Sequence, residues 1–123
     1  MQGNKSRNLI VDLSFDFALK IVSYVELLEK NRKYIIAKQL LKSGTSIGAN
    51  VREAQNAESK ADFIHKFKIA AKEADETEYW LLICKNSTGY ENCDQLLETC
   101  QDIIRILSKI IASSKSTQLP NPQ

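Results

Sequence analysis

The sequence predicts an all-α protein, an antiparallel four-helix bundle with up-down-up-down topology. Helix breakers are scarce, because the 123 residues include four glycines and two prolines, and both prolines lie among the last four residues. Apolar residues recur at helical spacing in four long segments joined by short polar connections, which places successive helices antiparallel. We expect one domain over residues 1–113 and a disordered polar tail over residues 114–123.

The first helix is expected from about Leu9 to Glu29. Its polar residues form one narrow stripe, and almost every other position is apolar. A helix on the surface of a monomer needs an apolar arc of only about 100°. This helix is therefore either sandwiched inside the fold or packed against a second subunit.

The second helix is expected from about Tyr34 to Ala57, with Gly44 and Gly48 one turn apart in its interior. A glycine inside a helix costs about 1 kcal/mol relative to alanine. The expected compensation is the close approach of another helix on the side where the two glycines lie.

Capping signals delimit the last two helices. Ser59 is a good N-cap, and Asp62 lies near the positive end of the next helix dipole. That third helix is expected to reach about Asn86, before a stop signal that ends at Gly89. The fourth helix is expected over residues 91–113.

The short turn near Ser59 makes the second and third helices an antiparallel hairpin. Counting residues outward from this turn places Gly44 opposite Ala74 and Gly48 opposite Ala70. Because small residues then face small residues, we expect these two helices to be in closest contact.

Charge is distributed unevenly, although the net charge is only +2. Residues 30–72 carry ten basic and three acidic side chains, whereas residues 73–102 carry one basic and eight acidic ones. Lysine supplies phosphate contacts without reading sequence, so the basic segment is a candidate nucleic-acid surface. Its candidate residues are Lys38, Lys42, Arg52, Lys60, Lys66, Lys68 and Lys72.

No catalytic constellation is apparent in the sequence. His65 is the single histidine, which rules out a histidine-based triad or a multi-histidine metal site. The three cysteines form no CxxC motif and are expected to be buried reduced thiols. We therefore expect a protein that is not an enzyme and that holds no metal or cofactor.

The segment from Leu40 to Leu81 resembles the four-helix bundle proteins encoded within intervening sequences of bacterial 23S rRNA genes. The blocks SIGANVREA, SKADFIHK and KEADETEYWL carry this resemblance, which covers about a third of the chain. It implies a cytosolic bacterial protein that forms a ring-like homo-oligomer, with five subunits as the expected number. A related protein is the accessory subunit of diversity-generating retroelements, which binds nucleic acid and a reverse transcriptase. The family's common SIP block reads Ser46-Ile47-Gly48 in this chain.

Polar positions that stand out in the family pattern form a candidate structural network. Among them Glu78 lies on an apolar stripe, and the hairpin count places it within reach of Lys42. A buried carboxylate needs such a partner. The candidate network consists of Ser46, Asn50, Glu53, Glu73 and Glu78.

Two functions remain open at this stage. The first is a non-enzymatic oligomer that binds RNA or DNA through its basic surface, where a ring repeats the basic patch in every subunit. The second is a structural scaffold or protein-interaction module with no nucleic-acid role. No apolar run approaches the roughly 20 residues of a membrane span, so a cytoplasmic location without a membrane partner is expected.

Overall fold

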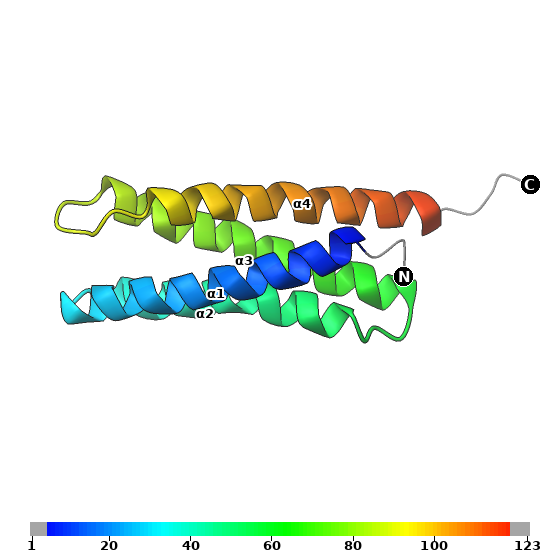
Figure 1. The fold of residues 1–123 in the computed structure, drawn as a ribbon, viewed down its shortest axis with the longest axis horizontal. Helices are drawn as coiled ribbons and strands as arrows, with labels where there is room; N and C mark the ends of the chain where they lie inside the picture. Colours follow the sequence, from blue (N-terminus) through cyan, green and yellow to red (C-terminus); the bar gives the residue numbers. More distant parts are fainter. Residues whose placement is uncertain (1–4, 119–123) are drawn as a thin grey trace, which may run out of the picture.

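The computed structural model of the chain describes residues 5–118, which form four α-helices and no strand. The helices are α1 (Lys5–Lys30), α2 (Tyr34–Ala54), α3 (Lys60–Asn86) and α4 (Asp94–Gln118). Each helix runs antiparallel to the one before it, and α4 packs against α1 as well as α3 (Figure 1). The predicted all-α four-helix bundle is confirmed.

Two helix ends differ from the expected positions because of local hydrogen bonds. α2 ends at Ala54 rather than Ala57, because Gln55 and Asn56 donate backbone hydrogen bonds three residues back and tighten the chain. α4 begins at Asp94 rather than residue 91, because the side chain of Asn92 accepts a hydrogen bond from the Asp94 amide at 3.0 Å.

The two outer ends of the fold also extend further than expected. α1 begins at Lys5, one turn before Leu9. α4 continues through residues 114–118, which were expected to be disordered, and Ser114 in this last turn is buried. The remainder of the expected tail, residues 119–123, lies outside the described part of the chain.

The N-cap of α3 is confirmed. The Ser59 hydroxyl accepts a hydrogen bond from the Asp62 amide at 3.0 Å, and the Asp62 carboxylate accepts one from the Glu58 amide at 3.2 Å. The backbone donors of Asp62, in the first turn, and of Glu58, directly before the N-cap, are thereby satisfied.

Two polar contacts across the α2–α3 hairpin show its register. The hydroxyls of Ser43 and Thr77 lie 2.9 Å apart in the core, and Lys66 Nζ lies 3.0 Å from Glu53 Oε1 nearer the turn. Both pairs agree with residue counting outward from Ser59. The most extensive packing of α2 is against α3, as expected.

The reason expected for the two glycines was wrong, because their closest neighbours belong to α1. A Cβ added at Gly44 would lie 2.9 Å from Cγ2 of Ile21, and one added at Gly48 would lie 3.2 Å from the carbonyl oxygen of Ser14. Ile21 and Ser14 are both fully buried. The glycines therefore let α1 approach α2. Ala70 and Ala74 are instead buried elements of the general core.

One side of α1 enters the core and the other stays exposed. Ile10, Phe17 and Ile21 are fully buried. Phe15 and Leu19, one turn apart, remain 57% and 52% exposed. In a single chain this helix is therefore not sandwiched, and several of its large apolar side chains stay exposed.

The turn between α1 and α2 is a Schellman motif with an unusual residue. Lys33 N donates to Leu28 O at 2.8 Å, and Arg32 N donates to Glu29 O at 2.9 Å. Arg32 occupies the left-handed position of this motif, with φ of 64°. Glycine is the residue that adopts this conformation without strain.

We expect Gly48→Leu to lower the free energy of unfolding by about 1–3 kcal/mol, because the neighbouring Ser14 carbonyl is backbone and cannot move aside easily. Urea denaturation measures the change. The control is Ala61→Leu at an exposed helical site, which should stay within about 0.5 kcal/mol of wild type. Equal stability of the two variants would contradict the close α1–α2 approach.

Arg32→Gly should raise the free energy of unfolding by about 0.5–1 kcal/mol, because it removes left-handed strain at a position that glycine accommodates. Lys30→Gly, two residues earlier in the last turn of α1, should instead lower it by about 1 kcal/mol. Thermal unfolding distinguishes these opposite signs.

Candidate nucleic-acid interface

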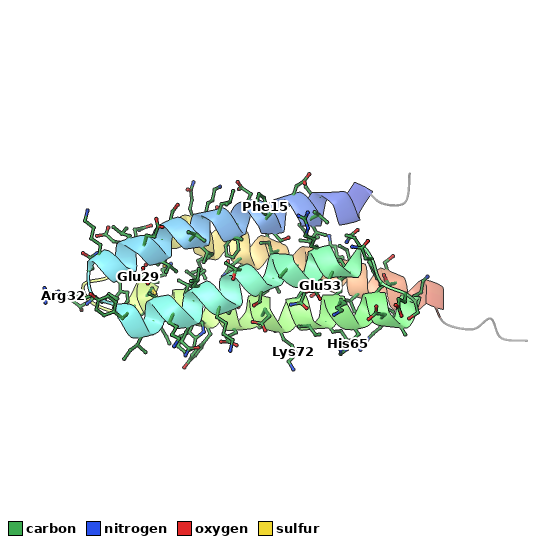
Figure 2. The ribbon with its side chains drawn as sticks, turned by 90° about the horizontal axis from the view of Figure 1, so that it is seen from below. Phe15, Glu29, Arg32, Glu53, His65 and Lys72 are labelled. Atoms are coloured by element: carbon green, nitrogen blue, oxygen red, sulfur yellow. The ribbon has the colours of Figure 1, made fainter. Side chains whose placement is uncertain are left out.

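The seven candidate basic residues lie on two adjacent helices, three on α2 and four on α3. All of them are exposed except Lys66, which is half-buried. Lys38 and Lys42 lie one turn apart on the solvent side of α2, and Lys68 and Lys72 repeat that spacing on α3. Figure 2 shows Lys72 on the outer edge of α3, directed away from the bundle.

These cations differ in their surroundings. Lys66 forms a salt bridge with Glu53 of α2, and this hydrogen bond raises the pKa of its ammonium group. Lys38, Lys42, Lys68 and Lys72 make no salt bridge with any residue in the range 5–118. These four lysines are therefore available to neutralise an anion, and we refer to them as the lysine face. Arg52 is exposed and also makes no salt bridge in this range.

One carboxylate interrupts the lysine face. Burial raises the pKa of Glu73, and the neighbouring Glu76 raises it further, whereas Lys42 and Lys72 act in the opposite direction. The carboxylate thus lies in the field of two lysines from different helices. It weakens the positive potential locally and links the charges of α2 and α3.

The five candidate polar residues do not form one hydrogen-bonded network. Ser46 and Asn50 bond to carbonyls of their own helix, those of Lys42 and Ser46. Glu78 accepts a hydrogen bond from Gln101 Nε2 of α4 at 3.1 Å. The expected pairing of Glu78 with Lys42 was therefore wrong, because Glu78 lies on the side of α3 that faces α4.

The buried polar contact between α2 and α3 was missed as a site. Ser43 and Thr77 are fully buried, and the Thr77 hydroxyl also lies 2.7 Å from the carbonyl oxygen of Glu73. Since a hydroxyl has one proton, Thr77 donates to the carbonyl and Ser43 donates to Thr77. A signal is present in the sequence, because Ser43 and Thr77 each lie at helical spacing between apolar residues and at the same level of the hairpin.

The three cysteines are buried and free, as expected. Burial raises the pKa of the Cys84 thiol to about 11 and that of Cys100 to about 12. Cys93 and Cys100 donate to the carbonyl oxygens of Leu81 and Ala74. The three thiols behave as small core residues. The two hydrogen bonds join Cys100 of α4, and Cys93 directly before α4, to α3.

Residues 5–118 offer neither a metal site nor a membrane-spanning helix. This range holds no cluster of three or more His, Cys, Asp or Glu side chains with metal-binding geometry. It also contains no helix with the length and apolar character needed to cross a membrane. His65 is exposed on the outer edge of α3 (Figure 2).

A shallow apolar groove runs between α1 and α2 on the side opposite α3 and α4. Its volume is about 270 Å³, and Arg52 is its only charged lining residue. Phe15 of α1 forms part of its wall and is labelled in Figure 2. The lining residues are Val11, Phe15, Ala18, Thr45, Gly48, Ala49 and Arg52.

The described residues define a small antiparallel four-helix bundle with a lysine face on α2 and α3. Residues 6–109 match the model of the 23S rRNA-intervening sequence protein family, and the chain belongs to this family. The resemblance carried by the three sequence blocks is thus confirmed.

A solved structure agrees with this assignment. It is a protein of unknown function from the S23 ribosomal protein family of Bacteroides thetaiotaomicron, with 42% sequence identity and a TM-score of 0.79. The similarity covers 83% of this chain and 97% of that chain. Among curated proteins, none matches the sequence.

We expect Thr77→Val to lower the free energy of unfolding by about 1–3 kcal/mol, because it leaves the buried Ser43 hydroxyl without its partner. Ser43→Ala should cost less, because Thr77 keeps its bond to the Glu73 carbonyl. The double variant should be less destabilised than the sum of the two single variants. Additive losses in urea denaturation would show that the two hydroxyls are not coupled.

Proposed function

We propose that this protein is a non-catalytic homo-oligomer that binds nucleic acid through its lysine face. The observation that carries the proposal is the set of four exposed lysines on adjacent helices, none of them in a salt bridge within the described chain. Such a surface neutralises phosphates and releases their counterions without reading base sequence. Repetition around an oligomer multiplies a modest affinity.

RNA is the first partner to test. The family takes its name from the intervening sequence of 23S rRNA, and the Bacteroides relative is assigned to a ribosomal protein family. These names favour RNA, although the lysine face, which binds phosphates, would also bind DNA. A cytoplasmic location is part of the proposal.

The proposed self-association rests on the unpartnered side of α1. Phe15, Leu19 and Val22 are exposed at helical spacing, and the groove beside Phe15 is apolar. A contiguous exposed apolar patch of this kind typically marks a protein–protein interface. We propose five subunits, on the resemblance to the family.

The nucleic-acid proposal predicts a specific salt dependence. Affinity for RNA should fall linearly on a log–log plot against salt concentration. The double variant Lys68→Glu/Lys72→Glu should bind more weakly and reduce the magnitude of the slope by about 2, because two phosphate contacts are lost. Fluorescence anisotropy at several salt concentrations measures both quantities.

The matched control changes the net charge by the same amount on another helix. Lys109 and Lys115 are exposed on α4, away from the lysine face. Lys109→Glu/Lys115→Glu should keep the wild-type slope. If wild-type protein binds neither RNA nor DNA at low salt, the scaffold function replaces this proposal.

The self-association proposal predicts that Phe15→Asp lowers the molar mass in solution. Light scattering of the wild type should give a multiple of 13.9 kDa, and the variant should dissociate because a charge enters an apolar contact. Tyr79→Asp is the control, since Tyr79 is equally exposed at 59% but lies on α3. A wild-type mass of one subunit would rule out the oligomer.

A further inference from the structure

A second hollow lies at the end of the bundle where α1 turns into α2. The loop between α3 and α4 returns to the same end (Figure 1), and it contributes Tyr90. The hollow has a volume of about 260 Å³. Its lining residues are Arg32, Lys33, Tyr34, Ile35, Ile36 and Tyr90.

The lining combines two cations, two tyrosines and two isoleucines, and includes no carboxylate. Lys33 Nζ lies 4.9 Å from the centre of the Tyr90 ring, a cation–π contact that holds the charge at the wall. Gly89, with φ of 86°, brings the loop close to this lysine, because a Cβ there would lie 3.5 Å from Lys33 Nζ.

Two of the lining residues are unusually exposed for their type. Tyr34 is 60% exposed and Ile35 is 80% exposed, although both lie at the start of α2 with an otherwise well-buried face. In the single chain most of the surface of these two side chains stays exposed. They therefore offer an aromatic and an aliphatic surface to an outside molecule.

The left-handed backbone of Arg32 lowers the stability of the fold. Its left-handed backbone is one that glycine adopts without strain, and Figure 2 shows the residue at the tip of the bundle. Local strain of this kind is concentrated at functional sites. An arginine at this position places a cation beside the hollow.

The hollow is continuous with the lysine face along α2. Lys38 follows Tyr34 by four residues and Lys42 follows Lys38 by four, so the three side chains lie on one side of the helix at intervals of about 6 Å. A chain with regularly spaced phosphates that begins in the hollow meets these lysines in succession.

We propose that this hollow binds single-stranded nucleic acid, with one base stacked on Tyr34 and its flanking phosphates held by Arg32 and Lys33. The inference rests on the proposed function and specifies its ligand. Aromatic rings next to cations accept unpaired bases of any identity. A duplex keeps its bases stacked internally, so it engages the lysine face but leaves the hollow empty.

The test compares a short labelled oligouridine with an RNA duplex of equal length, by fluorescence anisotropy at low salt. Tyr34→Ala should weaken binding of the single strand roughly 5- to 150-fold, the range that one base stacked on one aromatic ring contributes. Binding of the duplex should not change. Tyr34→Phe should retain wild-type affinity, and Tyr79→Ala should have no effect, because that equally exposed tyrosine lies on α3 outside the hollow.

Arg32→Gly separates binding from folding. It should leave the melting temperature unchanged or higher, and it should reduce the salt slope for the single strand by about 1. A loss of affinity in a variant that is at least as stable as wild type places the side chain in the binding site.

Two results would overturn the inference. If Tyr34→Ala binds oligouridine as wild type does while Lys68→Glu/Lys72→Glu does not, the lysine face stands and the hollow is not a base site. If Tyr34→Ala instead lowers the molar mass in light scattering, the hollow is a contact between subunits. Absence of all binding by the wild type would mark failure of the proposed function itself.

Discussion

The close approach of α1 to α2 is the constraint on which the rest of the bundle depends. It requires that Gly44 and Gly48 lack a Cβ, because Ile21 and the Ser14 backbone occupy the space that a side chain would take. Since α1 lies deep against α2, its Ile10, Phe17 and Ile21 side can enter the core that α3 and α4 complete. The free-energy cost of two glycines in one helix is offset by dispersion contacts and apolar burial at this crossing.

The same crossing explains why α1 has two unequal apolar sides. A helix in a four-helix bundle buries only the face directed at the shared core, so the side that carries Phe15 and Leu19 stays exposed. These residues cannot be explained by the stability of one chain. They are the physical basis for proposing self-association.

Two other features of the surface stand out: the lysines on the neighbouring helices α2 and α3, and the hollow at one end of the bundle. The α2–α3 hairpin brings lysines that are about 30 residues apart in sequence onto adjacent helices, and Glu73 moderates their field. The turn before α2 adds aromatic and aliphatic surface to this charge. In the folded chain Arg32 has a strained backbone, and Tyr34 and Ile35 are exposed. These features do not stabilise the fold, which is why we interpret the region as a contact for another molecule.

The sequence by itself determined the helical class, the four segments and the register of the α2–α3 hairpin. Apolar periodicity and the Ser59 cap are local signals, and a short turn leaves one antiparallel register for the two helices that it joins. The sequence did not determine which helix the glycines face, since a small residue indicates close approach without naming the partner. Nor did it place Glu78 beside Gln101 or Tyr90 beside Lys33. Those pairings depend on how each helix is rotated about its axis and on where the α3–α4 loop returns, and only the packing of all four helices decides them.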